Sequence, residues 1–138
     1  MTLSESAARE LFGGARVATL ATADAAGVPH LVPFTFAVAG DLVFHAVDHK
    51  PKRSANLRRI HNIRENSRVS ALVDHYDEDW SALWWVRIDG EAEVWEDDDA
   101  RAAPIRLLAD KYPQYVDRSP AGPVIAIRVL RWTGWTSG

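Results

Sequence analysis

Apolar and polar residues alternate along most of this chain, and this pattern restricts the fold to one built mainly from β-strands. Successive side chains of a strand point to opposite faces of a sheet, so a period of two marks a strand with one buried face. The pattern occurs in six segments: residues 16–22, 28–38, 42–47, 67–76, 82–96 and 123–135. Short turn sequences join the first three segments, which predicts an antiparallel meander.

Three other segments follow the helical period. Residues 2–12 have one apolar face, with Thr2 in the position of an N-cap and a glycine pair at the end. Residues 54–65 place apolar side chains three apart. The segment 96–112 opens with acidic residues that suit a helix N-terminus, and Pro104 predicts that the regular helix starts or kinks there.

The expected fold is therefore mainly β, with about six mostly antiparallel strands and three short peripheral helices. A β-barrel or a sheet with helices at its periphery satisfies this count. Residues 112–122 are expected to form a loop, and no repeat or linker divides the chain. We expect residues 1–138 to form a single domain, since this length is within the usual range for one core.

Composition excludes several classes of protein. The chain has no cysteine, so a disulfide, a thiolate metal site and a thiol nucleophile are all excluded. No basic leader with an apolar run precedes the first helix, and no segment reaches the roughly 18 apolar residues of a membrane span. We therefore expect a cytoplasmic protein without a membrane partner.

A cluster of five basic residues lies in "DHKPKRSANLRR", residues 48–59, of a chain whose net charge is -3. Lys50, Lys52 and Arg53 come directly before the helix predicted at 54–65. A helix N-terminus offers free N–H groups and a partial positive charge, which favour a phosphate, and arginine grips two phosphate oxygens at once. A solvated basic surface is the alternative. Nucleic acid is not expected as a partner, because the residues beyond the helix become acidic.

The sequence contains no glycine-rich nucleotide cradle and no recognisable metal-binding spacing. The five histidines, at 30, 45, 49, 61 and 75, are scattered along the chain, so we expect no protein-bound metal. The six tryptophans are expected mostly in the core. Alternation places Trp84 and Trp85 on opposite faces of their strand, where one of them would face a pocket or a partner subunit.

Four tracts in order resemble a known superfamily. "GVPHLVPFTFAV", "LVFHAVDHKPKRSANLRRI", "NSRVSALVDHY" and "VRIDGEAEV" are similar to the split β-barrel flavin and deazaflavin oxidoreductases, which include pyridoxamine 5′-phosphate oxidase. The resemblance runs from about residue 10 to 135. "VDHKPKR", "DEDWSALWWVRIDGEAEV" and "YPQY" are more narrowly similar to an actinobacterial subgroup of probable coenzyme F420-dependent enzymes.

This resemblance implies where a cofactor binds. In the superfamily, a basic pair before the helix grips the cofactor phosphate, and by position this pair is Lys52 and Arg53, with Lys50 and Arg58 beside it. The second strand lays its backbone along the ring system of the cofactor, which implicates Val32, Pro33, Phe34 and Thr35. The oxidase itself carries a further arginine on this strand and more basic residues near its C-terminus, so this chain departs from it at the site of the vitamin's phosphate.

The resemblance implies an oxidoreductase that transfers hydride from reduced coenzyme F420 to a small conjugated or aromatic substrate. The oligoglutamate tail of coenzyme F420 would need further cations, and Arg58, Arg59 and Arg64 are the candidates. FMN is the alternative cofactor, and a protein that binds a flavin or tetrapyrrole without turnover is the alternative function. The catalytic residues stay unknown; Tyr76, Arg87 and His45 are possible proton donors, and water is another.

A homodimer is the expected assembly. Six short strands leave open edges and an apolar face that three small helices scarcely cover, and soluble proteins normally bury such surfaces. Aromatic residues are also enriched in interface cores. The superfamily that the chain resembles forms dimers with the cofactor between the subunits.

Overall fold

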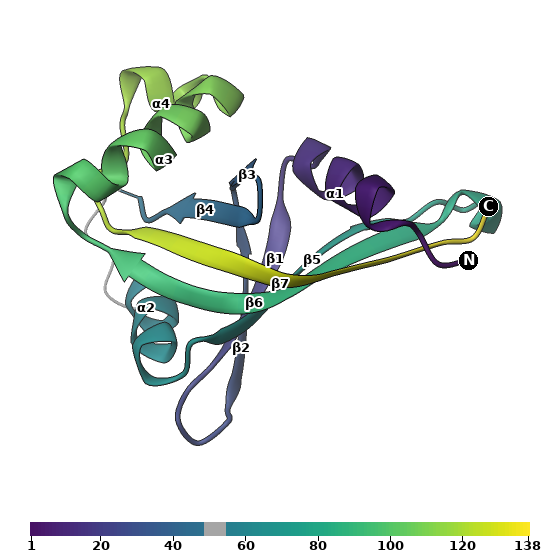
Figure 1. The fold of residues 1–138 in the computed structure, drawn as a ribbon, viewed down its shortest axis with the longest axis horizontal. Helices are drawn as coiled ribbons and strands as arrows, with labels where there is room; N and C mark the ends of the chain where they lie inside the picture. The colour runs from purple at the N-terminus through teal and green to yellow at the C-terminus, as the bar shows by residue number, and fades with distance from the viewer. Residues whose placement is uncertain (49–54) are drawn as a thin grey trace.

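The structure is a computed structural model that describes residues 1–48 and 55–138 (Figure 1). Its described part contains seven strands: β1 (Ala18–Ala23), β2 (Pro29–Phe34), β3 (Ala37–Ala39), β4 (Leu42–Ala46), β5 (Arg68–His75), β6 (Trp84–Trp95) and β7 (Val124–Thr136). The helices are α1 (Glu5–Gly14), α2 (Ala55–Glu65), α3 (Asp98–Lys111), α4 (Gln114–Asp117) and the short 3-10 helix η1 (Trp80–Ala82). The mainly β class with peripheral helices is confirmed.

All seven strands belong to one antiparallel sheet with the order β2-β1-β5-β6-β7-β4-β3. β2 and β3 lie at opposite ends of this order, yet only Thr35 and Phe36 separate them in the chain. The sheet must therefore curl until its two ends meet, which makes a barrel rather than an open sheet. In Figure 1, α1, α3 and α4 lie above the long strands β6 and β7, and α2 lies below them.

The predicted meander of the first three strands is confirmed in its two antiparallel pairings, but its continuity through the middle strand is wrong. β2 pairs with β1, but β3 and β4 form a separate hairpin whose outer partner is β7. The segment 28–38, predicted as one strand, is interrupted at Thr35 and Phe36, so the described sheet has one strand more than expected. The interruption lets the chain pass from one end of the sheet to the other.

The helices also differ from the prediction in detail. The N-cap of α1 is Ser4, whose Oγ accepts from the Ala7 N–H at 3.1 Å, and Thr2 instead bridges to Trp135 on β7. Helix α3 begins at Asp98, well before Pro104, with an acidic cap at its start. The expected loop 112–122 contains helix α4. Helix α2 matches the prediction within one residue.

The described residues form two apolar cores, one on each side of the sheet. Alternate residues of the strands fill the barrel interior, where Phe12 of α1 packs against Phe36 with ring centroids 4.8 Å apart. The second core lies under α3, where Leu108 and Tyr112 cover Phe44 of β4. Among the described residues, no helix is long and apolar enough to cross a membrane.

The tryptophans do not fill these cores as expected. In the single chain all six keep part of their surface exposed, and Trp80 at the β5–β6 connection is 68% exposed. Trp84 packs against the barrel core and its ring lies 6.0 Å from that of His75. Trp85 instead lies beside the guanidinium of Arg87, at 5.6 Å. Most of this aromatic surface is therefore half-buried at the margins of the barrel.

Candidate functional site

The strand predicted to contact a cofactor ring presents two kinds of side chain. Val32 packs against the barrel core and Phe34 belongs to it, so neither side chain is on the outer face of β2. Pro33 is exposed on that outer face, and Thr35 follows the strand at its end. A ring lying along β2 on the outside would contact its backbone and Pro33, but not the side chains of Val32 and Phe34.

The end of β2 is held by two tyrosines from the C-terminal helices. The Thr35 hydroxyl is 2.9 Å from the Tyr115 hydroxyl. The Phe36 N–H donates to Tyr112 Oη at 3.2 Å, and the same hydroxyl lies 3.1 Å from the Phe36 carbonyl oxygen. Lys111 Nζ also donates to the Phe36 carbonyl, at 3.0 Å. Residues 112–122 were expected to form a loop, so this anchoring by Tyr112 and Tyr115 was not predicted from the sequence.

His45 on β4 connects the end of β2 to helix α2. Its Nδ1 is 2.8 Å from the Thr35 carbonyl oxygen, and its Nε2 is 2.8 Å from Arg59 Nη1. A carbonyl can only accept and a guanidinium can only donate, so Nδ1 carries the proton and Nε2 accepts. Burial, assisted by the charge of Arg59, lowers the pKa of His45 to about 4. At neutral pH, His45 is a neutral connector with both nitrogens engaged, which removes it as a proton donor to a substrate.

The arginines of α2 have different surroundings. Arg58 is exposed, as expected for a residue that meets an anion at the surface. Arg59 is only 7% exposed, which corrects its interpretation as a surface cation, and burial lowers its pKa. Arg64 forms an ion pair with Glu96 at the other end of the helix. The sequence does contain a signal for the burial of Arg59. Arg59 lies four residues before Ile63, so the two side chains share the apolar face of the helix.

Lys50, Lys52 and Arg53 lie outside the described residues. The described chain stops at Asp48 after β4 and resumes at Ala55 with α2. The segment with these three residues thus links the strand that carries His45 to the helix that carries Arg59. Their role at a phosphate stays a prediction.

The other two candidate proton donors lie apart from this region. Tyr76 is at the end of β5, where its hydroxyl accepts from Trp80 Nε1 at 3.3 Å. Arg87 lies on β6 and donates from Nε to Asp89 at 3.1 Å. Among the described residues, the hydrogen bonds of Tyr76 and Arg87 are to nearby residues of the chain and involve neither β2 nor α2. In the part of the chain that is described, no group of acidic or histidine side chains is arranged for a metal.

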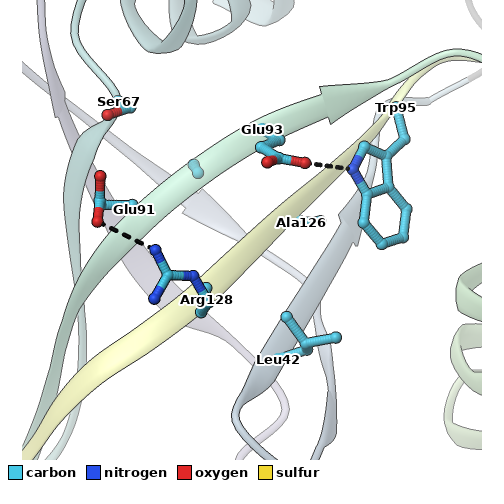
Figure 2. Close-up of a pocket in the computed structure, with 8 residues that line it drawn as sticks. Leu42, Ser67, Glu91, Glu93, Trp95, Ala126 and Arg128 are labelled. Atoms are coloured by element: carbon cyan, nitrogen blue, oxygen red, sulfur yellow. Dashed lines mark hydrogen bonds and ion pairs between the residues drawn. The ribbon is translucent and has the colours of Figure 1, made fainter.

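Two surface hollows lie away from β2 and α2. One, of about 340 Å³, is shown in Figure 2, where Glu91 pairs with Arg128 and Glu93 accepts from Trp95 Nε1. The other, of about 410 Å³, is lined by Arg68, Arg87, Asp89, Gly90, Leu130 and Arg131. Both are lined by a mixture of charged and apolar residues, and neither involves a residue of the predicted cofactor site. We assign no cofactor to them.

The sequence as a whole matches one known family. A family model described as pyridoxamine 5′-phosphate oxidase matches residues 4–136, which is nearly the entire chain. The chain belongs to this family. A search of curated proteins found no match.

Solved structures support the fold of this member of the pyridoxamine 5′-phosphate oxidase family. A conserved hypothetical protein from Mycobacterium tuberculosis matches with a TM-score of 0.77 and 23% identity, over 98% of this chain and 86% of that one. An FAD-binding protein from Mesorhizobium loti matches with a TM-score of 0.75 and 21% identity, over 97% of this chain and 95% of that one. HutZ, the heme storage protein of Vibrio cholerae, matches with a TM-score of 0.73 and 17% identity, over 99% of this chain and 95% of that one. At these identities the likeness establishes the split-barrel fold alone.

Proposed function

We propose that the protein is an oxidoreductase that binds a phosphate-bearing flavin or deazaflavin between β2 and the N-terminal end of α2. The observation that carries this proposal is the pair of 2.8 Å contacts from His45, one to the Thr35 carbonyl oxygen and one to Arg59. These contacts hold the strand predicted for the ring beside the helix predicted for the phosphate. The outer face of β2 carries the exposed apolar side chains of Leu31 and Pro33, while Val32 and Phe34 face inward, so a flat ring on this face would meet apolar surface.

A flavin such as FMN is our first candidate, and coenzyme F420 is the second. The tail of F420 needs cations beyond the phosphate site, and three arginines of α2 were the candidates. Arg59 is buried and Arg64 is paired with Glu96, which leaves Arg58 as the exposed member of the three. Membership of the pyridoxamine 5′-phosphate oxidase family and the likeness to a protein named FAD-binding also support a flavin. The resemblance of "VDHKPKR" to F420-dependent enzymes supports the second candidate.

The proposed reaction is hydride transfer with a small conjugated or aromatic organic substrate. The bound cofactor supplies the hydride chemistry, and the protein supplies binding and orientation. In this scheme the outer face of β2, with Pro33, supports the ring, while Lys52, Arg53 and Arg58 hold the phosphate with Lys50 nearby. His45 moves no proton, because both of its ring nitrogens are engaged.

A second copy of the chain is the proposed partner. Pro33 of β2 and Leu72 of β5 both pair with Thr19 of β1, so their side chains share the outer face of the sheet. Leu31 lies on the same face and is 66% exposed, and Leu72 is 40% exposed. This face offers apolar surface that a subunit interface would cover. The cofactor ring proposed on β2 would then lie at that interface.

Titration of the apoprotein with FMN, FAD and coenzyme F420 tests the proposal. Arg53→Ala should weaken binding by about 1.5–3 kcal/mol, the contribution of a charge-assisted hydrogen bond. Equal affinity of the wild type and the variant would remove the basic segment from the site. A steeper loss of F420 affinity than of FMN affinity with salt would instead favour the tailed coenzyme.

Turnover separates an enzyme from a binding protein. Steady oxidation of the reduced cofactor by an added quinone or aromatic nitro compound would support the oxidoreductase. Tight binding of a flavin without such oxidation would support storage or transport of the cofactor. Binding of heme in place of all three cofactors would contradict the proposal and favour a tetrapyrrole-binding protein.

A further inference from the structure

The hydrogen bonds around His45 form a continuous chain across four elements of the fold. Arg59 of α2 donates to His45 of β4, His45 donates to the Thr35 carbonyl after β2, and the Thr35 hydroxyl contacts Tyr115 of α4. His45 and Tyr115 were absent from the predicted cofactor site, and Arg59 was predicted only as a contact of the cofactor tail. The chain spans from the helix proposed for the phosphate to the strand proposed for the ring.

The geometry of the chain leaves His45 little freedom. Its ring is 6% exposed and lies edge-on to the Phe34 ring, with centroids 5.2 Å apart. Both nitrogens have a partner at 2.8 Å, and the partners fix the tautomer. A side chain held in this way acts as a rigid spacer, so the position of Arg59 relative to Thr35 is set by the size of one imidazole ring.

Arg59 transmits this spacing to helix α2. It is in the second turn of the helix, directly after the exposed Arg58. Burial holds its long side chain against the barrel, so a shift of the side chain requires a shift of the helix. The end of β2 has independent support from Tyr112 and Tyr115, whereas α2 reaches the end of β2 through Arg59 and His45.

We infer that His45 and Arg59 are positioning residues that set the distance between the phosphate-binding end of α2 and the ring-binding strand β2. This inference rests on the proposed function. It predicts that the two residues control how much the phosphate contributes to binding, while the ring keeps its contacts with β2. A pair that only stabilised the fold would affect a ligand with and without a phosphate equally.

FMN and riboflavin separate these two roles, because riboflavin has the same ring and lacks the phosphate. The wild type should bind FMN more tightly than riboflavin. In Arg59→Met, which keeps a side chain of similar length without its charge or donors, we expect FMN affinity to fall about tenfold or more and riboflavin affinity to change by less than about threefold. Arg64→Met is the matched control on the same helix, and its ratio of the two affinities should equal that of the wild type.

Two further variants complete the test. His45→Phe should lower the same ratio, and His45→Phe combined with Arg59→Met should lower it no further than Arg59→Met does, because the residues act as a unit. If circular dichroism shows that Arg59→Met is unfolded, Arg59→Lys replaces it, since its shorter reach to His45 should also lower the ratio. If the wild type binds only coenzyme F420, the same comparison uses that coenzyme and its phosphate-free deazaflavin fragment.

The outcomes distinguish the inference from the proposed function. A wild type that binds none of these ligands would refute the proposed function, and the inference with it. A wild type that prefers FMN, with an unchanged FMN to riboflavin ratio in the Arg59 variant, would refute the inference alone. Parallel losses of both affinities would also refute it, because they indicate general loosening of the fold.

Discussion

Replacing Tyr112 by phenylalanine tests how much its hydroxyl group contributes to holding the interruption between β2 and β3. Tyr112 is buried, and its hydroxyl accepts from the Phe36 N–H at 3.2 Å. The hydroxyl proton can go to the Arg16 carbonyl oxygen at 2.8 Å or to that of Phe36 at 3.1 Å. Phenylalanine keeps the ring, and with it the contacts of Arg16 and Lys111 over its face.

The expected loss follows from what the hydroxyl leaves behind. The Phe36 carbonyl keeps Lys111 Nζ as a donor, but the buried Phe36 N–H loses the acceptor that Tyr112 provides. A buried donor without a partner costs about 1–3 kcal/mol. For a chain of this length, that loss corresponds to a decrease of about 4–12 °C in the midpoint of thermal unfolding.

The assay is denaturant or thermal unfolding, followed by circular dichroism, of the wild type, Tyr112→Phe and Tyr115→Phe. Tyr115 is the matched control, since it is half-buried on the neighbouring helix and its hydroxyl contacts the Thr35 side chain at 2.9 Å. The Thr35 hydroxyl can turn to water, so Tyr115→Phe should cost less than about 1 kcal/mol. A larger loss in Tyr115→Phe than in Tyr112→Phe would show that the reasoning about the buried N–H is wrong.

Three further predictions concern other parts of the fold. Gly90→Ala would place a Cβ 2.3 Å from the Arg128 carbonyl oxygen, so denaturant unfolding should show a loss of about 3 kcal/mol; Gly14→Ala meets nothing within 4 Å and should be neutral or slightly stabilising. The pKa of His45 is about 4 in the folded chain against 6.5 for a free imidazole, so between these values the unfolded chain binds the extra proton. The contribution of neutral His45 to the free energy of unfolding should therefore be fully present above pH 6.5, and the free energy of unfolding should fall by roughly 3 kcal/mol towards pH 4. The His45→Phe variant should lack this dependence on pH. Sedimentation at micromolar concentration should give twice the 15.3 kDa chain mass, and a monomer that still binds cofactor tightly would contradict the shared interface.

Local patterns predicted most elements of the fold. The spacing of Leu57, Ile60 and Ile63 indicated α2, and alternation indicated β5, β6 and β7 within one or two residues of their observed ends. The interruption at Thr35 and Phe36 was missed because the alternation of apolar residues continues through it without a change of phase. A bend that preserves the alternation of apolar and polar residues cannot be detected from that alternation.

The order of strands and the surroundings of single residues were beyond local reasoning. β4 pairs with β7, which lies about eighty residues away in the chain, and no turn sequence encodes that pairing. Arg59 and Arg58 are adjacent and chemically identical, and only their angle around the helix decides that one is buried. The apolar periodicity that located α2 contains this angle, but the basic character of the pair favoured a surface interpretation.

The place of β7 in the sheet has a consequence for synthesis of the protein. β7 follows all the other strands in the chain, yet it lies between β6 and β4 in the sheet. While the chain emerges from the ribosome, the β3–β4 hairpin has no partner until β7 is made, about eighty residues later. Until then two separate pieces of sheet expose unpaired edges, a state that is prone to aggregation. The barrel therefore cannot close before β7 has been made.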